Sequence, residues 1–143
     1  MQVRHILRDK GRDVTTISSK ATVSEAASLL ADKRIGAVVI SGDNGSIAGI
    51  LSERDIVRAL AEAGTGALSQ TVAIYMTRDV ATCCDDDSID ELMEMMTHGR
   101  FRHVPVVESE RLAGIVSIGD VVKTRIAETV QEAQSLREYI AAG

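Results

Sequence analysis

Gly49-Ile50-Leu51-Ser52-Glu53-Arg54-Asp55 returns 65 residues later as the near copy Gly114-Ile115-Val116-Ser117-Ile118-Gly119-Asp120. In each copy a glycine and two apolar residues end a strand-like run, and a serine then precedes an acid by three residues. A serine and an acid at this spacing satisfy the free N–H groups at the start of a helix. The same N–H groups and the helix dipole attract anions. The motif therefore predicts a strand-to-helix turn that is either a plain capped helix or a phosphate or ribose site.

The residues before the motif repeat as well, at an offset of 66. The matched segments are a β-branched run (14–16 and 80–82), a helix start (Thr22 with Glu25, and Ser88 with Glu91) and a buried-strand run (38–41 and 104–107). Both helix starts have the composition of a capping box. In the helix after Ser52, the spacing places Ile56, Val57 and Leu60 on the inner face. Phase-keeping over this length predicts a duplicated β-α-β-β-α unit of the α/β (α+β) class.

The repeat divides the chain into five parts. These are an N-terminal arm (1–13), a first repeat (14–63), a linker (64–79), a second repeat (80–127) and a C-terminal helical extension (128–143). Each repeat alone is small for a stable core, so the two are expected to share one. The apolar stripe of the extension needs a cover, and a partner subunit is the expected one.

The overall composition argues against several classes of protein. Hydrophobic residues make up 45% and charged residues 26% of the 143 residues, with no apolar run near the roughly 20 needed to span a bilayer and no signal-peptide pattern. A cytoplasmic protein is expected. The net charge of -5 argues against a general nucleic-acid binder. Aromatic residues are only 2%, so any base-binding pocket is expected to have aliphatic and backbone walls.

Neither the cysteines nor the acidic run predicts catalysis or a metal site. Cys83 and Cys84 are adjacent in sequence, and no histidine and acid stand in a recognisable arrangement with them. The run 85–87 is Asp-Asp-Asp, which lacks the alternate spacing of a calcium loop and is typical of a solvated turn. We expect no catalytic residue, no metal and no required cofactor.

The duplicated unit resembles a tandem pair of cystathionine-β-synthase (CBS) domains, also called a Bateman module, from Val14 to about Ala127. The resemblance lies in the two Gly-apolar-apolar-Ser-x-x-Asp motifs, in the junction Met76-Thr77-Arg78-Asp79-Val80 and in Arg102-His103-Val104-Pro105-Val106-Val107. It implies two repeats packed about a pseudo-twofold axis, with two clefts between them. It also implies that modules pair into a four-repeat disc, and that adenine nucleotides or related adenosyl ligands bind as signals.

The resemblance assigns roles to residues of both motifs. Asp55 and Asp120 would bind ribose hydroxyls, because a carboxylate accepts both protons. Ser52 and Ser117 would meet the phosphate at the helix start, and Arg54 could hold a phosphate in the Asp55 cleft. Ile115, which lies in the second motif, belongs to the same expected ligand site.

Other expected contacts lie before and between the motifs. Arg102 and His103 are at positions where the family often places phosphate-binding groups, whereas the first repeat has Gly36 and Ala37 there. The smaller residues of the first repeat leave space, so Ala37 and Val38 are expected to face the adenine of a ligand anchored on Asp120. Backbone contacts from Ser18 would complete that site. The Asp120 cleft is expected to be the tighter monophosphate site.

The sequence thus favours a non-catalytic sensor for an adenine nucleotide. AMP is the favoured ligand, with ATP, ADP or NAD(H) as alternatives. Homodimerisation and an effector protein on another chain are expected. Two other functions stay open at this point: a structural pairing module whose clefts hold no physiological ligand, and an enzyme built on Cys83 or Cys84.

Overall fold

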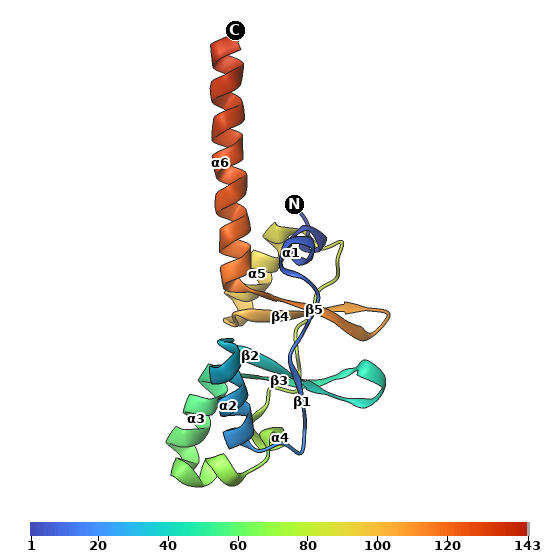
Figure 1. Cartoon of the computed structure of the whole chain (residues 1–143), viewed down its shortest axis with the longest axis vertical. Coiled ribbons are helices and arrows are strands. Elements are labelled where there is room, and N and C mark those ends of the chain that lie inside the picture. Colours follow the sequence, from blue (N-terminus) through green and yellow to red (C-terminus); the bar gives the residue numbers. More distant parts are fainter. Residues whose placement is uncertain (143) are drawn as a thin grey trace.

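Two α/β halves lie one above the other in the computed structural model, and the last helix projects well beyond them (Figure 1). The structure describes residues 1–142. The first half consists of β1 (Thr16–Ser18), α2 (Val23–Lys33), β2 (Ala37–Ser41), a short 3-10 turn η1 (Asp43–Gly45), β3 (Ile47–Ser52) and α3 (Glu53–Ala63). The second half consists of α5 (Ile89–Gly99), β4 (His103–Glu108), β5 (Arg111–Ser117) and α6 (Ile118–Ala142). The remaining elements are α1 (Val3–Lys10), η2 (Gly64–Ser69) and α4 (Val72–Tyr75).

The two sheets share one register. β2 pairs antiparallel with β3 so that Ala37 faces Ser52, and β4 pairs with β5 so that His103 faces Ser117. Each hairpin also has a shift of register near the end of its first strand. The predicted duplication of the β-α-β-β-α unit is therefore confirmed in the hairpins and in the helices that flank them.

The first strand of the unit is duplicated only in part. β1 pairs parallel with β2, but the matching run at 80–82 forms no strand. One parallel bridge joins Cys83 to Val106, with the Cys83 N–H donating to the Pro105 carbonyl at 3.0 Å. The sheet of the second half thus has two strands and a single bridge, because proline at 105 has no N–H to donate to a ladder.

The helix ends repeat even where the backbone is unusual. α2 ends at Arg34 and α5 at Arg100, and both residues are in the left-handed conformation with φ of 56°. That conformation commonly ends helices, but glycine usually supplies it. Two arginines 66 residues apart adopt it here, so the duplication extends to a costly local geometry.

The four predicted helix caps differ in kind. Thr22 and Ser88 accept the backbone N–H of Glu25 and Glu91, at 3.1 and 3.0 Å. Among these four caps, the reciprocal bond, in which the carboxylate of the acid accepts the backbone N–H of the capping residue, is found only in the two Ser-x-x-Asp motifs. The capping box predicted from Thr22 with Glu25, and its copy, are therefore simple N-caps.

Each half has its own core, so the expectation of one shared core was wrong. One cluster of buried residues contains Val38, Leu51 and their neighbours in the first half, and a separate cluster contains Val104, Val116 and their neighbours in the second. Each half gains apolar surface from outside its own unit. α4 adds Val72 to the first core, and α1 adds Val3, Ile6 and Leu7 to the second.

α3 and α6, the last helices of the two halves, leave apolar side chains in solvent. Val57 on α3 is 65% exposed and Leu60 is 37% exposed, so the inner face predicted for them was wrong. Asp55 and Ala59 are the buried residues of that helix. Val122 on α6, which is the equivalent of Val57, is 45% exposed. Further along, α6 exposes Ile126, Val130, Leu136, Tyr139 and Ile140.

Candidate functional site

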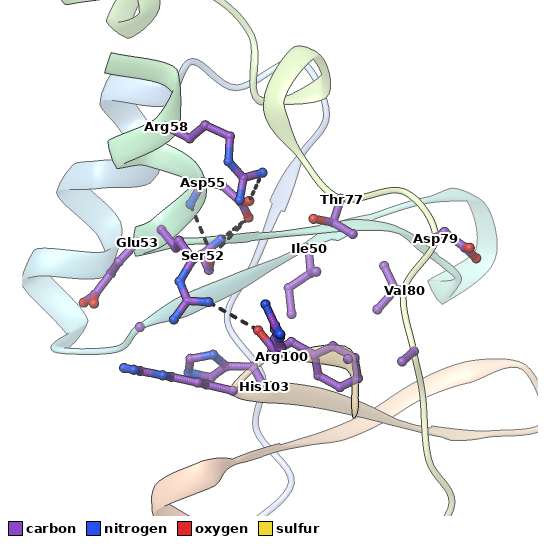
Figure 2. Close-up of a pocket in the computed structure, with 16 residues that line it drawn as sticks. Ile50, Ser52, Glu53, Asp55, Arg58, Thr77, Asp79, Val80, Arg100 and His103 are labelled. Atoms are coloured by element: carbon purple, nitrogen blue, oxygen red, sulfur yellow. Dashed lines mark hydrogen bonds and ion pairs between the residues drawn. The ribbon is translucent and has the colours of Figure 1, made fainter. Parts of the chain in front are cut away.

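A cavity of about 300 Å³ opens between the two halves beside the first motif (Figure 2). The first half contributes the end of β3 and the start of α3, and the second half contributes the loop between α5 and β4. Residues 77–81, which connect the halves, form another side. The lining residues are Gly36, Ile50, Ser52, Glu53, Arg54, Asp55, Arg58, Thr77, Asp79, Val80, Ala81, Gly99, Arg100, Phe101, Arg102 and His103.

Asp55 is held in place by the helix cap that it completes. Its Oδ2 accepts the Ser52 N–H at 2.9 Å and the Ser52 hydroxyl at 3.1 Å. The Asp55 N–H donates to the Ser52 Oγ at 3.3 Å. The carboxylate is 7% exposed, and Oδ1 faces the Arg58 guanidinium at 3.7 Å. Oδ1 accepts no hydrogen bond within residues 1–142, so it is available to a ligand hydroxyl.

Four arginines surround the cavity. Arg54 and Arg58 lie one turn apart on α3, and Arg100 and Arg102 lie on the facing loop. The Arg54 guanidinium donates to the Arg100 carbonyl at 3.3 Å and so bridges the halves (Figure 2). Three carboxylates, from Glu53, Asp55 and Asp79, share the lining, which leaves an excess of positive charge. Guanidinium groups match phosphate geometry, so the cavity is suited to an anionic ligand.

The cavity also has apolar lining residues. Ile50, Val80 and Ala81 line it together with Phe101, the single phenylalanine of the chain. The expectation of purely aliphatic and backbone walls was therefore wrong. The low aromatic content limits how many rings exist, whereas the fold decides where the one phenylalanine lies.

His103 fills space that Gly36 leaves open. A Cβ at Gly36 would lie 3.0 Å from Cε1 and 3.1 Å from Nε2 of His103. Burial lowers the pKa of His103, although the nearby Glu53 carboxylate opposes this effect. The imidazole is therefore neutral at pH 7 and offers one donor and one acceptor to the cavity.

The second motif has a different environment. Its cap is like that of the first motif: Asp120 Oδ2 accepts the Ser117 N–H at 2.9 Å. The same oxygen also accepts a hydrogen bond from the Lys10 ammonium at 2.7 Å. Burial alone would raise the pKa of Asp120, but the bonds from Lys10 and Ser117 outweigh it and the pKa is lowered. Asp120 is an ion-paired carboxylate at neutral pH.

The predicted ligand residues thus fall into two groups. Ser52, Arg54, Asp55, Arg102 and His103 meet in the cavity. The others lie outside it.

Those outside it belong to strands or to the second motif. Ala37 and Val38 are buried side chains of β2, 5% and 0% exposed, and the Ser18 Oγ accepts the Lys20 N–H. Ser117 caps α6, and the Ile115 carbonyl accepts a hydrogen bond from Lys10. Their assignment to an Asp120 site stays a prediction.

Several lining residues were not anticipated from the sequence. Arg58 lies one helical turn after Asp55, and that spacing could have indicated it. Arg100 and Phe101 follow α5 at positions whose copies in the first half, Arg34 and Ile35, do not line the cavity. Only the packing of the halves reveals them.

The cysteines and acidic groups do not extend the site. Cys83 is 2% exposed, and burial raises the pKa of its thiol to about 12, which is far from a reactive thiolate. Among residues 1–142, no group of three or more His, Cys, Asp and Glu side chains could hold a metal ion. No helix of this part of the chain is long and apolar enough to cross a membrane.

Comparison with known proteins reveals the relatives of this fold. The model of the CBS domain matches residues 3–62 and 72–127. The crystal structure of a CBS-domain-containing protein from Agrobacterium tumefaciens is 50% identical, covers 87% of this chain and 99% of its own, and superposes with a TM-score of 0.85. A CBS domain protein from Pyrobaculum aerophilum, complexed with AMP, is 28% identical, with coverage of 84% and 89% and a TM-score of 0.75.

A third similar structure also contains adenosyl ligands. The CBS domain pair of protein MJ0100, in complex with 5'-methylthioadenosine and S-adenosyl-L-methionine, is 29% identical, with coverage of 90% and 98% and a TM-score of 0.80. The family model matches both halves of the chain separately, as the duplicated structure requires. The chain therefore belongs to the CBS domain family and contains a pair of these domains.

Proposed function

We propose that this chain is a non-catalytic sensor that binds an adenine nucleotide, with AMP favoured, in the cavity beside Asp55. The observation that carries the proposal is the chemistry of that single cavity. Four arginines from α3 and from the facing loop line it, a carboxylate with a free oxygen lies at a helix start, and a phenylalanine lies among the apolar lining residues. These three features match phosphate, ribose and base respectively.

The ligands of similar structures support the class of ligand. One similar protein is complexed with AMP, and another with two adenosyl compounds. The positive charge beside Asp55 favours a phosphate-bearing ligand over the uncharged 5'-methylthioadenosine. AMP, ADP, ATP and NAD(H) all meet this requirement, and the volume of about 300 Å³ favours the smallest of them.

Ligand binding would act on the arrangement of the two halves. Arg54 and Asp55 belong to one half and Arg102 to the other, so a bound nucleotide contacts both. A ligand shifts a conformational equilibrium only by its differential affinity for the two states. A contact set shared between halves supplies that difference, and a second copy of the chain or an effector protein would receive the signal.

The test is thermal unfolding and calorimetric titration with AMP, ADP, ATP and NADH. A ligand at about 100 times its dissociation constant adds roughly 2.7 kcal/mol, which is several degrees for a domain of this size. Arg102→Gln should weaken AMP binding by about 10-fold to 100-fold, the worth of one charge-assisted hydrogen bond. Arg137→Gln on the exposed part of α6 is the matched control and should bind as the wild type does. Flat responses to all four nucleotides would refute the proposal.

A structural pairing module is the alternative function. The observation that favours it is the set of apolar side chains exposed on α3 and α6. It predicts a dimer whose dissociation constant is the same with and without AMP. A nucleotide-dependent change of that constant would support the sensor.

A further inference from the structure

Each half is covered by a short helix from outside its own repeat. α1 packs against the second half, and α4 packs against the first. Leu7 of α1 covers Gly114, because a Cβ at that glycine would lie 2.9 Å from a Leu7 methyl. Met76, just after α4, covers Gly49 in the same way, at 2.7 Å from its Sδ. α1 and α4 are thus equivalent docking segments. Three residues after Leu7 comes Lys10, and three residues after Met76 comes Asp79.

Opposite charges lie beside the two motifs, an aspartate beside the first and a lysine beside the second. Asp79 lines the cavity beside Asp55. In the second half, the Lys10 ammonium donates to Asp120 Oδ2 at 2.7 Å and to the Ile115 carbonyl at 3.0 Å. Both acceptors belong to the Gly-apolar-apolar-Ser-x-x-Asp motif, so one cation engages the motif at two points.

Lys10 is held there by the packing of its helix. Val3, Ile6 and Leu7 are 0%, 4% and 1% exposed in the core of the second half. The Gly11 N–H donates to the Leu7 carbonyl at 2.8 Å and ends the helix next to Lys10. The docked helix therefore holds the Lys10 backbone beside the second motif, and the exposed lysine side chain reaches Asp120 from there.

Lys10 bonds to one of the two carboxylate oxygens of Asp120 and neutralises its charge. A ribose hydroxyl binds a carboxylate by donating a proton to it. Asp120 Oδ2 already accepts from the Ser117 N–H and from Lys10. The cap oxygen of Asp120 therefore has an ion-pair partner that the cap oxygen of Asp55 lacks within residues 1–142, and a nucleoside at the second motif would have to displace or pass this ammonium.

We infer that Lys10 is an internal occupant of the Asp120 motif and restricts adenine-nucleotide binding to the Asp55 cavity, one molecule per chain. The inference rests on the proposed nucleotide-binding function of the CBS pair. Removal of the Lys10 ammonium opens the second motif. Lys10 is thus the residue that makes two related clefts unequal.

The experiment counts AMP molecules per chain by isothermal titration calorimetry on the full chain. Lys10→Met removes every donor and keeps an unbranched side chain, and Lys20→Met, at an exposed lysine of the first half, is the matched control. Asp55→Asn removes the charge of the first motif and keeps an oxygen for the helix cap. The expected counts are one for the wild type and for Lys20→Met, two for Lys10→Met, none for Asp55→Asn and one for the double variant Lys10→Met/Asp55→Asn.

The outcomes separate the two proposals. Equal counts in the wild type and Lys10→Met overturn the inference, whatever the number. A wild type that binds no AMP, together with a Lys10→Met that binds one, refutes the Asp55 site and supports the role of Lys10. Loss of a site in Lys10→Met would mean that Lys10 binds ligand, which also overturns the inference. Circular dichroism and urea unfolding of each variant establish that the counts come from folded protein.

Discussion

At the scale of single residues, two equivalent glycines are covered by unlike groups. A Cβ at Gly49 would lie 2.7 Å from the Met76 Sδ and 2.8 Å from the Thr77 carbonyl oxygen. A Cβ at Gly114 would meet only the methyl groups of Leu7, at 2.9 and 3.0 Å. The Thr77 carbonyl is fixed, because it accepts the Ile50 N–H in a backbone bridge. A leucine side chain can move at much lower cost than such a backbone group.

We therefore expect Gly49→Ala to lower the free energy of unfolding by about 2 to 3 kcal/mol, and Gly114→Ala by about 1 kcal/mol, because overpacking costs more where the neighbour cannot relax. Urea unfolding of both variants measures the difference, and each variant is the control for the other. Equal losses, or a larger loss for Gly114→Ala, would contradict this explanation.

At the scale of an element, α1 is attached to the second half by apolar packing and by one pH-sensitive ion pair. The pKa of Asp120 is lowered in the folded protein because the bonds from Lys10 and Ser117 outweigh the effect of burial. A lowered pKa stabilises the fold above the unfolded-state pKa of about 3.9, and that stability is lost as the pH falls through the folded value.

Lys10→Met is accordingly expected to cost about 1 kcal/mol at pH 7, a value typical of a partly exposed ion pair. The difference from the wild type should shrink as the pH falls below about 4 and through the lowered pKa of Asp120, since the carboxylate that pairs with Lys10 becomes protonated there. Urea unfolding at pH 7, 5 and 3.5 tests this, with Lys20→Met as control. The Arg12–Asp85 pair, which lowers the pKa of Asp85, is present in both proteins and cancels. A difference that stays constant with pH would show that the ion pair does not stabilise α1.

At the scale of the whole molecule, the pseudo-twofold symmetry places exposed apolar residues at matching points of both halves. Val57 on α3 and Val122 on α6 are equivalent, and both are exposed, at 65% and 45%. Leu60 and Ile126 extend these surfaces. Apolar groups gathered on helices in this way mark an association surface, and a second copy of the chain is the cover that we expect.

Val57→Glu/Val122→Glu should therefore convert a dimer into a monomer, with at least a 100-fold rise in the dissociation constant, because two charges per chain would be buried unpaired. Light scattering after size-exclusion chromatography measures the mass. Ile74→Glu, at a 61% exposed residue of α4, is the control and should leave the dimer intact. A wild-type monomer, or a double variant that still dimerises, would contradict the expectation.

The repeating unit and most of its elements can be predicted from the sequence. The Ser-x-x-Asp motifs, the N-caps at Thr22 and Ser88, and the apolar runs that became β2 and β4 depend on bonds and spacings within a few residues, which can be read along the chain. The same local rules located Asp55, and the family resemblance added Arg102 and His103 on the facing half.

Contacts between side chains of distant segments could be identified only in the tertiary structure. That Phe101 and Arg100 join the Asp55 cavity, that each half has a separate core, and that Lys10 reaches Asp120 all depend on contacts between segments distant in sequence. The contact of Lys10 with Asp120 cannot be read along the chain, because the two residues are 110 positions apart. Periodicity predicts which face of an element is apolar. The element against which that face packs depends on packing and ion pairing between distant parts of the chain, and these contacts make the surroundings of Asp55 and Asp120 different.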